Sequence, residues 1–280
     1  MELGRCAEYL RKQIEKYGCI HATLIDQEKT SPKKAKEVVR EVLELGSKLI
    51  LEGGSGYVDR DGRTEKVARA IKEEINDFYK RTDERVLLVG FPGNRSQVAP
   101  SLDAIFFLRL LNAPDRRFLI DEPMAGVRQI KEYGLDVIKV GYLITRPGTT
   151  AAKVTRALIP PEEPKEKRIE LINNYALYLL YSSGPGAFLY LDAGSGAKKP
   201  EDPEVVRAVK EETPLNVIVG GGVKDYETAR KLSANLADII VTGTVVEEDL
   251  SKLEDILNGI EEGVKERKSV KKVRGFAQLR

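Results

Sequence analysis

The sequence predicts an α/β protein built as a single (β/α)8 TIM barrel, and three observations support this fold. Eight short runs rich in Val, Ile and Leu recur along the chain, as expected of parallel strands buried on both faces. Amphipathic stretches that fit helices separate these runs. The chain has 280 residues, and one such barrel commonly fills roughly 250. We therefore assign residues 1–280 to one barrel domain.

The apolar runs give the expected strands in chain order. The predicted strands cover residues 19–25, 48–51, 86–91, 104–108, 137–144, 187–191, 216–219 and 239–242. A helix is predicted over 31–45, because Ser31 is a good N-cap, Pro32 suits the first helical position and Gly46 follows the end. Further helices are expected at residues 165–181, 203–212, 224–232 and 247–260.

The composition excludes several classes of function. A net charge of +2 and the lack of a nucleic-acid motif argue against a nucleic-acid partner. Cys6 and Cys19 form no CxxC pair, so a reducing, cytoplasmic location is expected. His21 is the only histidine, which removes most Ser-His-Asp triads and multi-histidine metal sites. We expect His21 to be a hydrogen-bonded core residue, and acid–base chemistry then falls to carboxylates, Lys or Tyr.

Glycine-rich turns after the last two strands predict phosphate binding. Barrel active sites lie at the carboxyl ends of the strands, and phosphate sites often use the loops after strands seven and eight. Gly220-Gly221-Gly222 follows the seventh predicted strand, and Gly243-Thr244 follows the eighth. Glycine lets backbone N–H groups approach an anion closely. Each loop alone is explained by a tight turn, but two neighbouring loops favour a phosphorylated ligand.

The sixth predicted strand ends in a third polar loop, residues 190–197, with the sequence YLDAGSGA. Asp192 is expected to accept a hydrogen bond from a substrate hydroxyl or to act as a general base. Ser195 and the N–H groups of Gly194 and Gly196 are expected to bind phosphate oxygens. This loop sets an acid, a hydroxyl and two glycines at the same mouth as the other two loops.

Polar residues after the first two strands predict a metal and diphosphate site. Asp26 follows the first strand, and Ser55 lies in the loop after the second. Mg²⁺ prefers one or two carboxylates together with water and substrate phosphates, so Asp26 is a candidate ligand. An aspartate that only caps a helix or forms a salt bridge is the alternative. Lys29 is a candidate diphosphate contact, although a lone lysine is more often solvated.

Taken together, the sequence blocks at these loops and strands, in this order, resemble the geranylgeranylglyceryl phosphate synthase / PcrB prenyltransferase family. The blocks are HATLIDQEK at 21–29, GGS at 53–55, FPGN at 91–94, SLDAIFFLRLLN at 101–112, KVGYLITRPG at 139–148, YLDAGSGA at 190–197, GGGVKD at 220–225 and VTGTVVEE at 241–248. The resemblance implies a Mg²⁺-dependent enzyme that joins sn-glycerol 1-phosphate to a polyprenyl diphosphate, geranylgeranyl diphosphate in the archaeal branch. It also implies a homo-oligomer, either a dimer or a hexamer.

The resemblance also implies roles for particular residues. Asp26 and Ser55 would bind magnesium. Glycerol phosphate would be held by Tyr190, Leu191, Asp192, Ala193, Gly194, Ser195, Gly196, Gly221, Gly222, Gly243 and Thr244. The chain departs from the family where Asp192 replaces the usual Glu, Thr244 replaces Asn, and residues 145–148 (TRPG) replace a VEPG-like loop. The first departure matters most, because misplacing a base by about 1 Å can cost roughly 100-fold in rate.

The implied reaction is a displacement at the first carbon of an allylic diphosphate. Asp192 would take the proton from the glycerol hydroxyl. The ring face of Tyr142 would stabilise positive charge on the allylic carbon, so Tyr142 is the second candidate catalytic residue. The hydrocarbon tail needs an apolar groove, for which Phe106, Phe107 and Tyr142 are candidates. The same aromatic side chains also suit the barrel core.

Two other functions compete with the transferase. Lys139 lies within a strand, as the Schiff-base lysine of a class I aldolase or lyase barrel does, provided that its side chain points inward. Strand alternation puts Lys139 and Tyr142 on opposite faces. The second competitor is a non-catalytic barrel that only binds a phosphorylated metabolite, a possibility raised by the altered residues Asp192 and Thr145.

Two surface features leave partners open. Tyr175, Tyr178 and Tyr181 share roughly one face of the helix at 165–181, where packing on the barrel is expected and a subunit interface is the alternative. Residues 265–280 carry seven Lys or Arg and one acidic residue. This segment is expected to be a solvated helix end with a frayed tail. Its alternative role is peripheral contact with anionic lipid at a membrane surface, or with a neighbouring subunit.

Overall fold

The structure, a computed structural model, describes residues 4–277, including the side chains of all of these except 247, 248 and 268–277. At its centre, parallel strands pair in sequence order and close into a barrel. The strands are β1 (Ile20–Ile25), β2 (Leu49–Glu52), β3 (Leu87–Gly90), β4 (Ala104–Leu110), β5 (Asp136–Ile144), β6 (Phe188–Asp192), β7 (Asn216–Gly220) and β8 (Ile239–Thr242). The predicted (β/α)8 barrel is confirmed, with every predicted strand found to within two residues.

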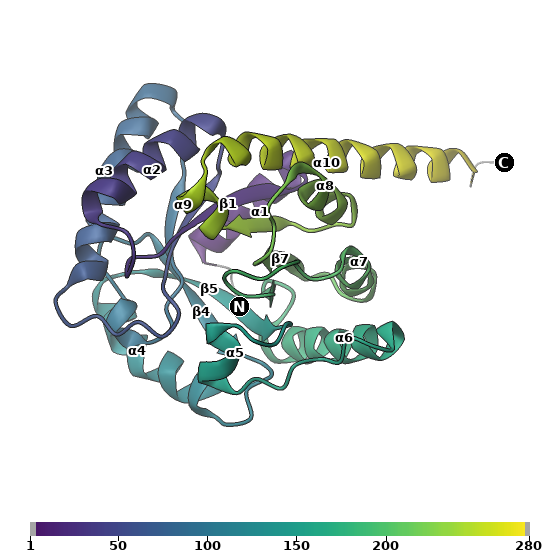
Figure 1. Cartoon of the computed structure of the whole chain (residues 1–280), viewed down its shortest axis with the longest axis horizontal. Helices are drawn as coiled ribbons and strands as arrows, with labels where there is room; N and C mark the ends of the chain where they lie inside the picture. The colour runs from purple at the N-terminus through teal and green to yellow at the C-terminus, as the bar shows by residue number, and fades with distance from the viewer. Residues whose placement is uncertain (1–3, 278–280) are drawn as a thin grey trace.

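Helices separate the strands and surround the barrel, as Figure 1 shows. They are α1 (Arg5–Tyr17), α2 (Pro32–Leu45), α3 (Arg63–Thr82), α4 (Glu122–Glu132), α5 (Thr150–Thr155), α6 (Lys165–Ser183), α7 (Pro203–Glu212), α8 (Tyr226–Ala234), α9 (Thr244–Glu248) and α10 (Ser251–Ala277), with short helical turns η1 (Arg95–Gln97) and η2 (Arg117–Asp121). The predicted start of α2 is confirmed, because the Ser31 side chain accepts a hydrogen bond from the backbone of Lys34.

The single helix predicted over 247–260 is wrong at both ends. Asp249 is extended, with a φ of −156°, and ends α9. The side chain of Asp249 then accepts a hydrogen bond from the backbone N–H of Ser251 at 3.1 Å, which starts α10. Figure 1 shows α10 projecting beyond the barrel, and it continues to Ala277. The side chains of 268–277, and all of 278–280, belong to the predicted basic tail but lie outside the described residues.

Two apolar layers hold the barrel together. One layer fills the barrel interior with side chains such as Leu51, Phe106 and Val140, and α1 extends it with Leu10 and Ile14. The other layer lies between the strands and the outer helices. Successive side chains of each strand point alternately into the barrel interior and towards the outer helices. At the carboxyl end of a strand, therefore, every second side chain faces the mouth of the barrel. Among residues 4–277, none of the helices combines the length and the apolar character needed to cross a membrane.

Candidate active site

Two adjoining cavities lie at the carboxyl ends of the strands. A polar cavity of about 330 Å³ is lined by residues from loops after β1, β2, β6, β7 and β8. An apolar cavity of about 530 Å³ lies beside it, towards β3, β4, α4 and α5. The residues that line both are Leu24, Gly53, Ser55, Phe91 and Tyr142. The cavities therefore meet at Tyr142 and Phe91.

Most of the predicted site residues share the polar cavity, although they come from distant parts of the chain. Those that line it are Asp26, Ser55, Tyr142, Tyr190, Asp192, Ser195, Gly196, Gly221, Gly222, Gly243 and Thr244. Leu191, Ala193 and Gly194 do not line it. Leu191 packs in the outer apolar layer, and the N–H of Ala193 donates to Gly220 O at 2.9 Å.

Asp192 is a buried carboxylate with defined partners. The hydroxyl of Tyr142 donates to Asp192 Oδ2, and the N–H of Gly194 donates to Asp192 Oδ1 at 2.8 Å. Burial raises the pKa of Asp192 above its ordinary value, and these two hydrogen bonds partly oppose that rise. Burial and the nearby Asp192 raise the pKa of Tyr142 well above its usual range, so Tyr142 remains a donor. The Gly194 N–H, predicted to bind phosphate, is instead engaged by Asp192.

An aromatic cluster forms the wall where the two cavities meet. Phe91 stacks on Tyr190 with ring centroids 5.2 Å apart, and meets Tyr142 edge to face at 5.6 Å. Tyr142 and Tyr190 are also edge to face, at 5.4 Å. Phe91 follows directly after β3, and only its place in the FPGN block hinted at a functional role. Aromatic faces at this junction can stabilise a nearby positive charge.

The glycine turns after β6 and β7 press against each other. A Cβ on Gly221 would lie 2.5 Å from Gly194 O, and a Cβ on Gly222 would overlap the Lys199–Pro200 peptide. Gly221 and Gly222 also have positive φ values of 78° and 75°, which favour glycine. These loops can approach so closely only because side chains are absent here.

The same turns present hydrogen-bond donors to the polar cavity. Within the described part of the chain, the backbone N–H groups donate to no protein acceptor at Ser195, Gly196, Gly221, Gly222 and Thr244. The hydroxyls of Ser195 and Thr244 lie 3.2 Å apart and join the loops after β6 and β8. Lys29, Lys224 and Lys252 add positive charge to the lining. Sequence analysis missed Lys252, which is the second residue of α10 and follows the VTGTVVEE block without belonging to it. Unused amides and lysines together suit an anionic ligand.

Asp26 and Ser55 face the polar cavity from the opposite loops. Asp26 Oδ1 accepts a hydrogen bond from the Glu28 backbone at 3.0 Å, and Asp26 Oδ2 forms an ion pair with Lys29 at 3.1 Å. A Cβ on Gly54 would lie 2.9 Å from Asp26 Oδ1, so glycine lets the Ser55 loop pass close to this carboxylate. Among the described residues, His, Cys, Asp and Glu side chains form no cluster of three that could hold a metal.

Gln97 fastens the Ser55 loop to the loop after β3. Its side-chain oxygen accepts from the N–H of Gly93 at 3.1 Å. Its side-chain nitrogen donates to Gly54 O at 3.0 Å and to Tyr57 O at 2.7 Å. Gln97 is buried, so these bonds are shielded from water. The candidate metal loop is therefore held in place rather than free.

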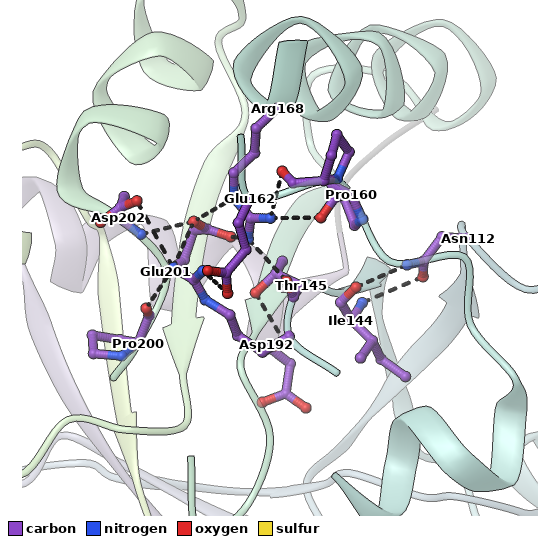
Figure 2. Close-up of polar contacts among 12 residues, drawn as sticks. Asn112, Ile144, Thr145, Pro160, Glu162, Arg168, Asp192, Pro200, Glu201 and Asp202 are labelled. Atoms are coloured by element: carbon purple, nitrogen blue, oxygen red, sulfur yellow. Dashed lines mark hydrogen bonds and ion pairs between the residues drawn. The ribbon is translucent and has the colours of Figure 1, made fainter. Parts of the chain in front are cut away.

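The loop at residues 145–148 takes part in a buried polar network behind Asp192 (Figure 2). Arg168 of α6 pairs with Glu201 and donates to Thr145 O at 2.9 Å. The backbone N–H of Thr145 donates to Asp192 O at 2.8 Å, and its hydroxyl donates to the same oxygen at 3.2 Å. Arg146 lines neither cavity and pairs with Glu162 at 2.9 Å. The network therefore supports the backbone of Asp192 from outside the barrel.

The structure decides two further predictions. Ile138, Val140 and Tyr142 face the interior, whereas Lys139 points outward and its amine lies 3.5 Å from Ser183 O at the end of α6. The class I aldolase interpretation required an inward Lys139 and is therefore wrong. The prediction for His21 is confirmed.

His21 is a core residue with both ring nitrogens hydrogen-bonded. One nitrogen lies 3.0 Å from the Ser47 hydroxyl and the other 2.8 Å from the Thr242 hydroxyl. Burial lowers the pKa of His21 to about 3, so the ring is neutral. A neutral, fully hydrogen-bonded ring beneath the cavity suits a structural role.

Comparisons with known proteins agree with this site. The PcrB family model matches residues 12–264. Geranylgeranylglyceryl phosphate synthase of Thermofilum pendens is 40% identical over 247 residues, covering 88% of this chain and 89% of that protein. The same-named protein of Pyrococcus horikoshii is 35% identical over 267 residues, covering 93% and 98%.

Solved structures agree as well. Wild-type GGGPS from Thermoplasma volcanium superposes with a TM-score of 0.79 at 30% identity, covering 90% of this chain and 97% of that chain. The Thermoplasma acidophilum (S)-3-O-geranylgeranylglyceryl phosphate synthase, solved in complex with its substrate sn-glycerol-1-phosphate, gives a TM-score of 0.76 at 30% identity, covering 95% and 100%. On this similarity in sequence and structure over most of its length, the chain belongs to the PcrB family.

Proposed function

We propose that this protein is a geranylgeranylglyceryl phosphate synthase. It joins sn-glycerol 1-phosphate to geranylgeranyl diphosphate, forming 3-O-geranylgeranyl-sn-glyceryl 1-phosphate and diphosphate, the first ether bond of archaeal membrane lipids. One observation carries the proposal: a cavity lined by unused amides and lysines opens into an apolar cavity, with Asp192 and Tyr142 near the junction. Similar proteins bear this name, and one was solved with sn-glycerol-1-phosphate.

Glycerol phosphate is assigned to the side of the cavity formed by the loops after β6, β7 and β8. The phosphate accepts hydrogen bonds from amides such as those of Gly221 and Thr244. The glycerol hydroxyl then faces Asp192, which removes its proton as the new C–O bond forms. The bond between the allylic carbon and the diphosphate oxygen breaks, and its electron pair leaves on the diphosphate. Tyr142 keeps the Asp192 carboxylate oriented by donating to it.

The prenyl chain is assigned to the apolar cavity. Its lining is largely hydrophobic and includes Val98, Ile105, Phe106, Phe107, Leu108, Leu110, Phe118 and Ile130. The predicted groove residues Phe106 and Phe107 are among these, and both also pack in the core. Placing the tail here puts the allylic carbon beside Tyr142 and Phe91, where ring faces stabilise developing positive charge. The aromatic wall then separates the hydrocarbon from the ionic groups.

Mg²⁺ is the proposed cofactor, held between Asp26, Ser55 and the substrate diphosphate. The residues fit this ion, because magnesium commonly takes one or two protein carboxylates and completes its shell with water and phosphate oxygens. Asp26 faces the cavity, and Gly54 leaves room for the Ser55 loop beside it. When bound, the ion would neutralise charge on the leaving diphosphate. Lys29, which already contacts Asp26, adds positive charge to the same corner.

A direct assay tests this function. Purified protein is incubated with Mg²⁺, sn-glycerol 1-phosphate and radiolabelled geranylgeranyl diphosphate, and the organic-extractable ether product is quantified. Product formation that falls by at least about 100-fold in Asp192→Asn is the expected result. Folded protein that binds glycerol phosphate but forms no ether would instead favour a non-catalytic phosphometabolite-binding barrel. Parallel reactions with sn-glycerol 3-phosphate and shorter prenyl donors define stereochemistry and chain length.

We also propose that the protein is a homo-oligomer through the outer face of α6. Tyr175 packs on the outer apolar layer, so the predicted packing is confirmed for this residue alone. Tyr178 and Tyr181 are 50% and 82% exposed. Exposed aromatic side chains are enriched at protein interfaces. Light scattering of the wild type and of Tyr178→Asp tests this, since an unchanged mass would exclude the α6 face.

A further inference from the structure

Exposed apolar side chains gather around the opening of the apolar cavity. Among the described residues, seven large Leu, Ile, Val or Met side chains are exposed, and six of them lie on the β2–α3 loop, η2–α4 and the α5 region. We call these six the mouth surface: Val58 (54% exposed), Ile120 (46%), Met124 (56%), Val127 (43%), Val154 (50%) and Leu158 (59%). The seventh, Leu45, ends α2. Clustering of this kind marks an interaction site rather than scattered exposure.

The mouth surface is continuous with the cavity. Ile120, Met124 and Val127 follow an i, i+4, i+7 pattern, so they lie along one face of the η2–α4 helical segment. Other residues of this segment, Phe118, Gly126 and Ile130, line the cavity.

Two members of the mouth surface connect the outside to the cavity lining. Val58 and Val154 are exposed and also line the cavity. Phe118 and Ala152 belong to one apolar cluster, which joins η2 to α5. Both α4 and α5 lie along the lower part of the molecule in Figure 1. The exposed side chains thus surround the entrance that the proposed prenyl chain uses.

The charges beside the mouth surface suit an anionic partner. Three of the nearby acids are neutralised within the region, in the pairs Arg116–Asp121, Arg117–Glu122 and Arg156–Asp115. Arg128 and Lys131 on α4, and Lys153 on α5, are exposed and form no ion pair within the described residues. On α4, Glu132 is the acid that remains outside these pairs. On α4 and α5, cations therefore outnumber free acids, whereas beside Val58 the acids Asp59 and Asp61 are matched by Arg60 and Arg63.

We propose that the mouth surface docks on a lipid bilayer that contains anionic headgroups. Apolar side chains flanked by Lys and Arg are the pattern by which peripheral proteins lie in a bilayer interface. The inference rests on the proposed function, because a twenty-carbon donor and its lipid product partition into membranes. In the docked protein the apolar cavity faces the bilayer. The prenyl chain of the donor or product then passes between cavity and membrane without crossing water. None of the six residues of the mouth surface belongs to the basic segment 265–280.

Vesicle co-sedimentation of the full chain, without substrate, tests the docking surface. Met124→Asp is compared with Leu45→Asp, which makes the same charge change at an exposed apolar side chain remote from the mouth. Neither residue lines either cavity. Met124→Asp should weaken binding to phosphatidylglycerol–phosphatidylcholine vesicles about tenfold, the factor for withdrawing one apolar side chain of this size. Leu45→Asp should bind like the wild type.

Charge variants form the second arm of the experiment. Lys131→Gln should weaken binding about fivefold on vesicles that contain phosphatidylglycerol and leave binding to pure phosphatidylcholine unchanged. Equal binding by the wild type and Met124→Asp would overturn the proposal. A lower particle mass for Met124→Asp than for the wild type in light scattering would also overturn the proposal, because the mouth surface would then be a subunit interface.

Ether synthesis in detergent micelles separates this inference from the proposed function. Met124→Asp should retain the wild-type rate there, because the substrates no longer come from a bilayer. Vesicle binding that depends on Met124, in a protein that makes no ether in micelles, would reject the transferase and support the docking surface. If the protein makes ether in micelles but Met124→Asp binds vesicles as well as the wild type does, the docking proposal is wrong and the proposed transferase function is unaffected.

Discussion

Replacing Glu201 with Gln removes a buried negative charge without changing the size of the side chain. Glu201 and its partner Arg168 are 0% and 1% exposed. Glu201 also lies 3.6 Å from Arg146, so it balances two guanidinium groups. Removing one partner of a buried ion pair costs about 3–5 kcal/mol, because the remaining charge stays in a medium of low dielectric constant.

The hydrogen bonds that Arg168 keeps in Glu201→Gln determine how much stability is lost. Arg168 keeps the carbonyl oxygens of Pro160, Pro161 and Thr145 as acceptors. We therefore expect a loss near the lower limit, about 3 kcal/mol of unfolding free energy. For a chain of this size that loss corresponds to a fall of about 6 °C in Tm.

Glu204→Gln is the matched control. Lys165 and Glu204 form an ion pair of 2.8 Å between the same two segments as Arg168 and Glu201, but their side chains are 39% and 66% exposed. Exposed pairs contribute at most about 1 kcal/mol. Urea unfolding followed by far-UV circular dichroism measures both variants, since the sequence has no Trp for fluorescence. Equal losses in the two variants would refute the view that burial makes the Arg168–Glu201 pair important.

Four further predictions concern the site and its surroundings. Asp192→Asn should lower kcat by about 10²–10⁴, the usual contribution of a general base, with glycerol phosphate binding retained in calorimetry. In the wild type, kcat should fall at acid pH as Asp192 gains a proton. The fall should begin at a higher pH than for an ordinary aspartate, because burial raises the pKa of Asp192. In Tyr142→Phe the carboxylate loses a hydrogen bond that lowers this pKa, so the fall in kcat should move to still higher pH. Gly222→Ala should weaken glycerol phosphate binding more than Gly148→Ala weakens it. Both positions have positive φ, but only the Cβ at Gly222 meets neighbouring backbone, and equal effects would contradict the close approach of the loops. Glu52→Gln should stabilise the protein increasingly as pH rises. The Glu52 carboxyl lacks a hydrogen-bond partner among the described residues, and burial raises its pKa well above the usual value. The folded wild type therefore favours the neutral carboxylic acid. Its unfolding free energy should fall as pH rises above the pKa of Glu52 in the unfolded chain, by up to about 1.4 kcal/mol per pH unit. Urea unfolding of the wild type and Glu52→Gln at a series of pH values should show a difference in unfolding free energy that grows with pH. A difference that stays constant with pH would count against a buried acid.

The barrel and the meeting of its loops could be predicted because both follow from local patterns. Short apolar runs predict parallel strands, and the carboxyl ends of parallel strands converge at one mouth. Asp26, Asp192 and Gly221 therefore share a cavity, although they are far apart in the sequence. No contact had to be known in advance. The strand period also placed Lys139 and Tyr142 on opposite faces.

The partners within the site could not be predicted in the same way. Arg168 lies in the charged stretch KEKRIEL and looks like a solvated helical residue, yet it is buried against Glu201. Periodicity assigns a residue to a face, but it does not reveal which loop covers that face. The Arg168–Glu201 contact depends on how α6 and the loop before α7 approach each other, which the sequence pattern does not contain. The Gly194 amide is a local case: its acceptor is the Asp192 side chain two residues earlier, and periodicity does not reveal how that side chain turns within the loop.

The loop at residues 145–148 and Asp192, the proposed base, belong to one structural unit. The carbonyl of Asp192 is held by Thr145, and its carboxylate is held by Tyr142 and Gly194. Arg168 holds Thr145 in turn. An aspartate has one methylene fewer than a glutamate with which to adjust its position, so its backbone must supply the placement that a longer side chain would provide. Loss of the Arg168–Thr145 contact should therefore lower the rate of catalysis as well as stability, because misplacement of a base by about 1 Å costs roughly 100-fold.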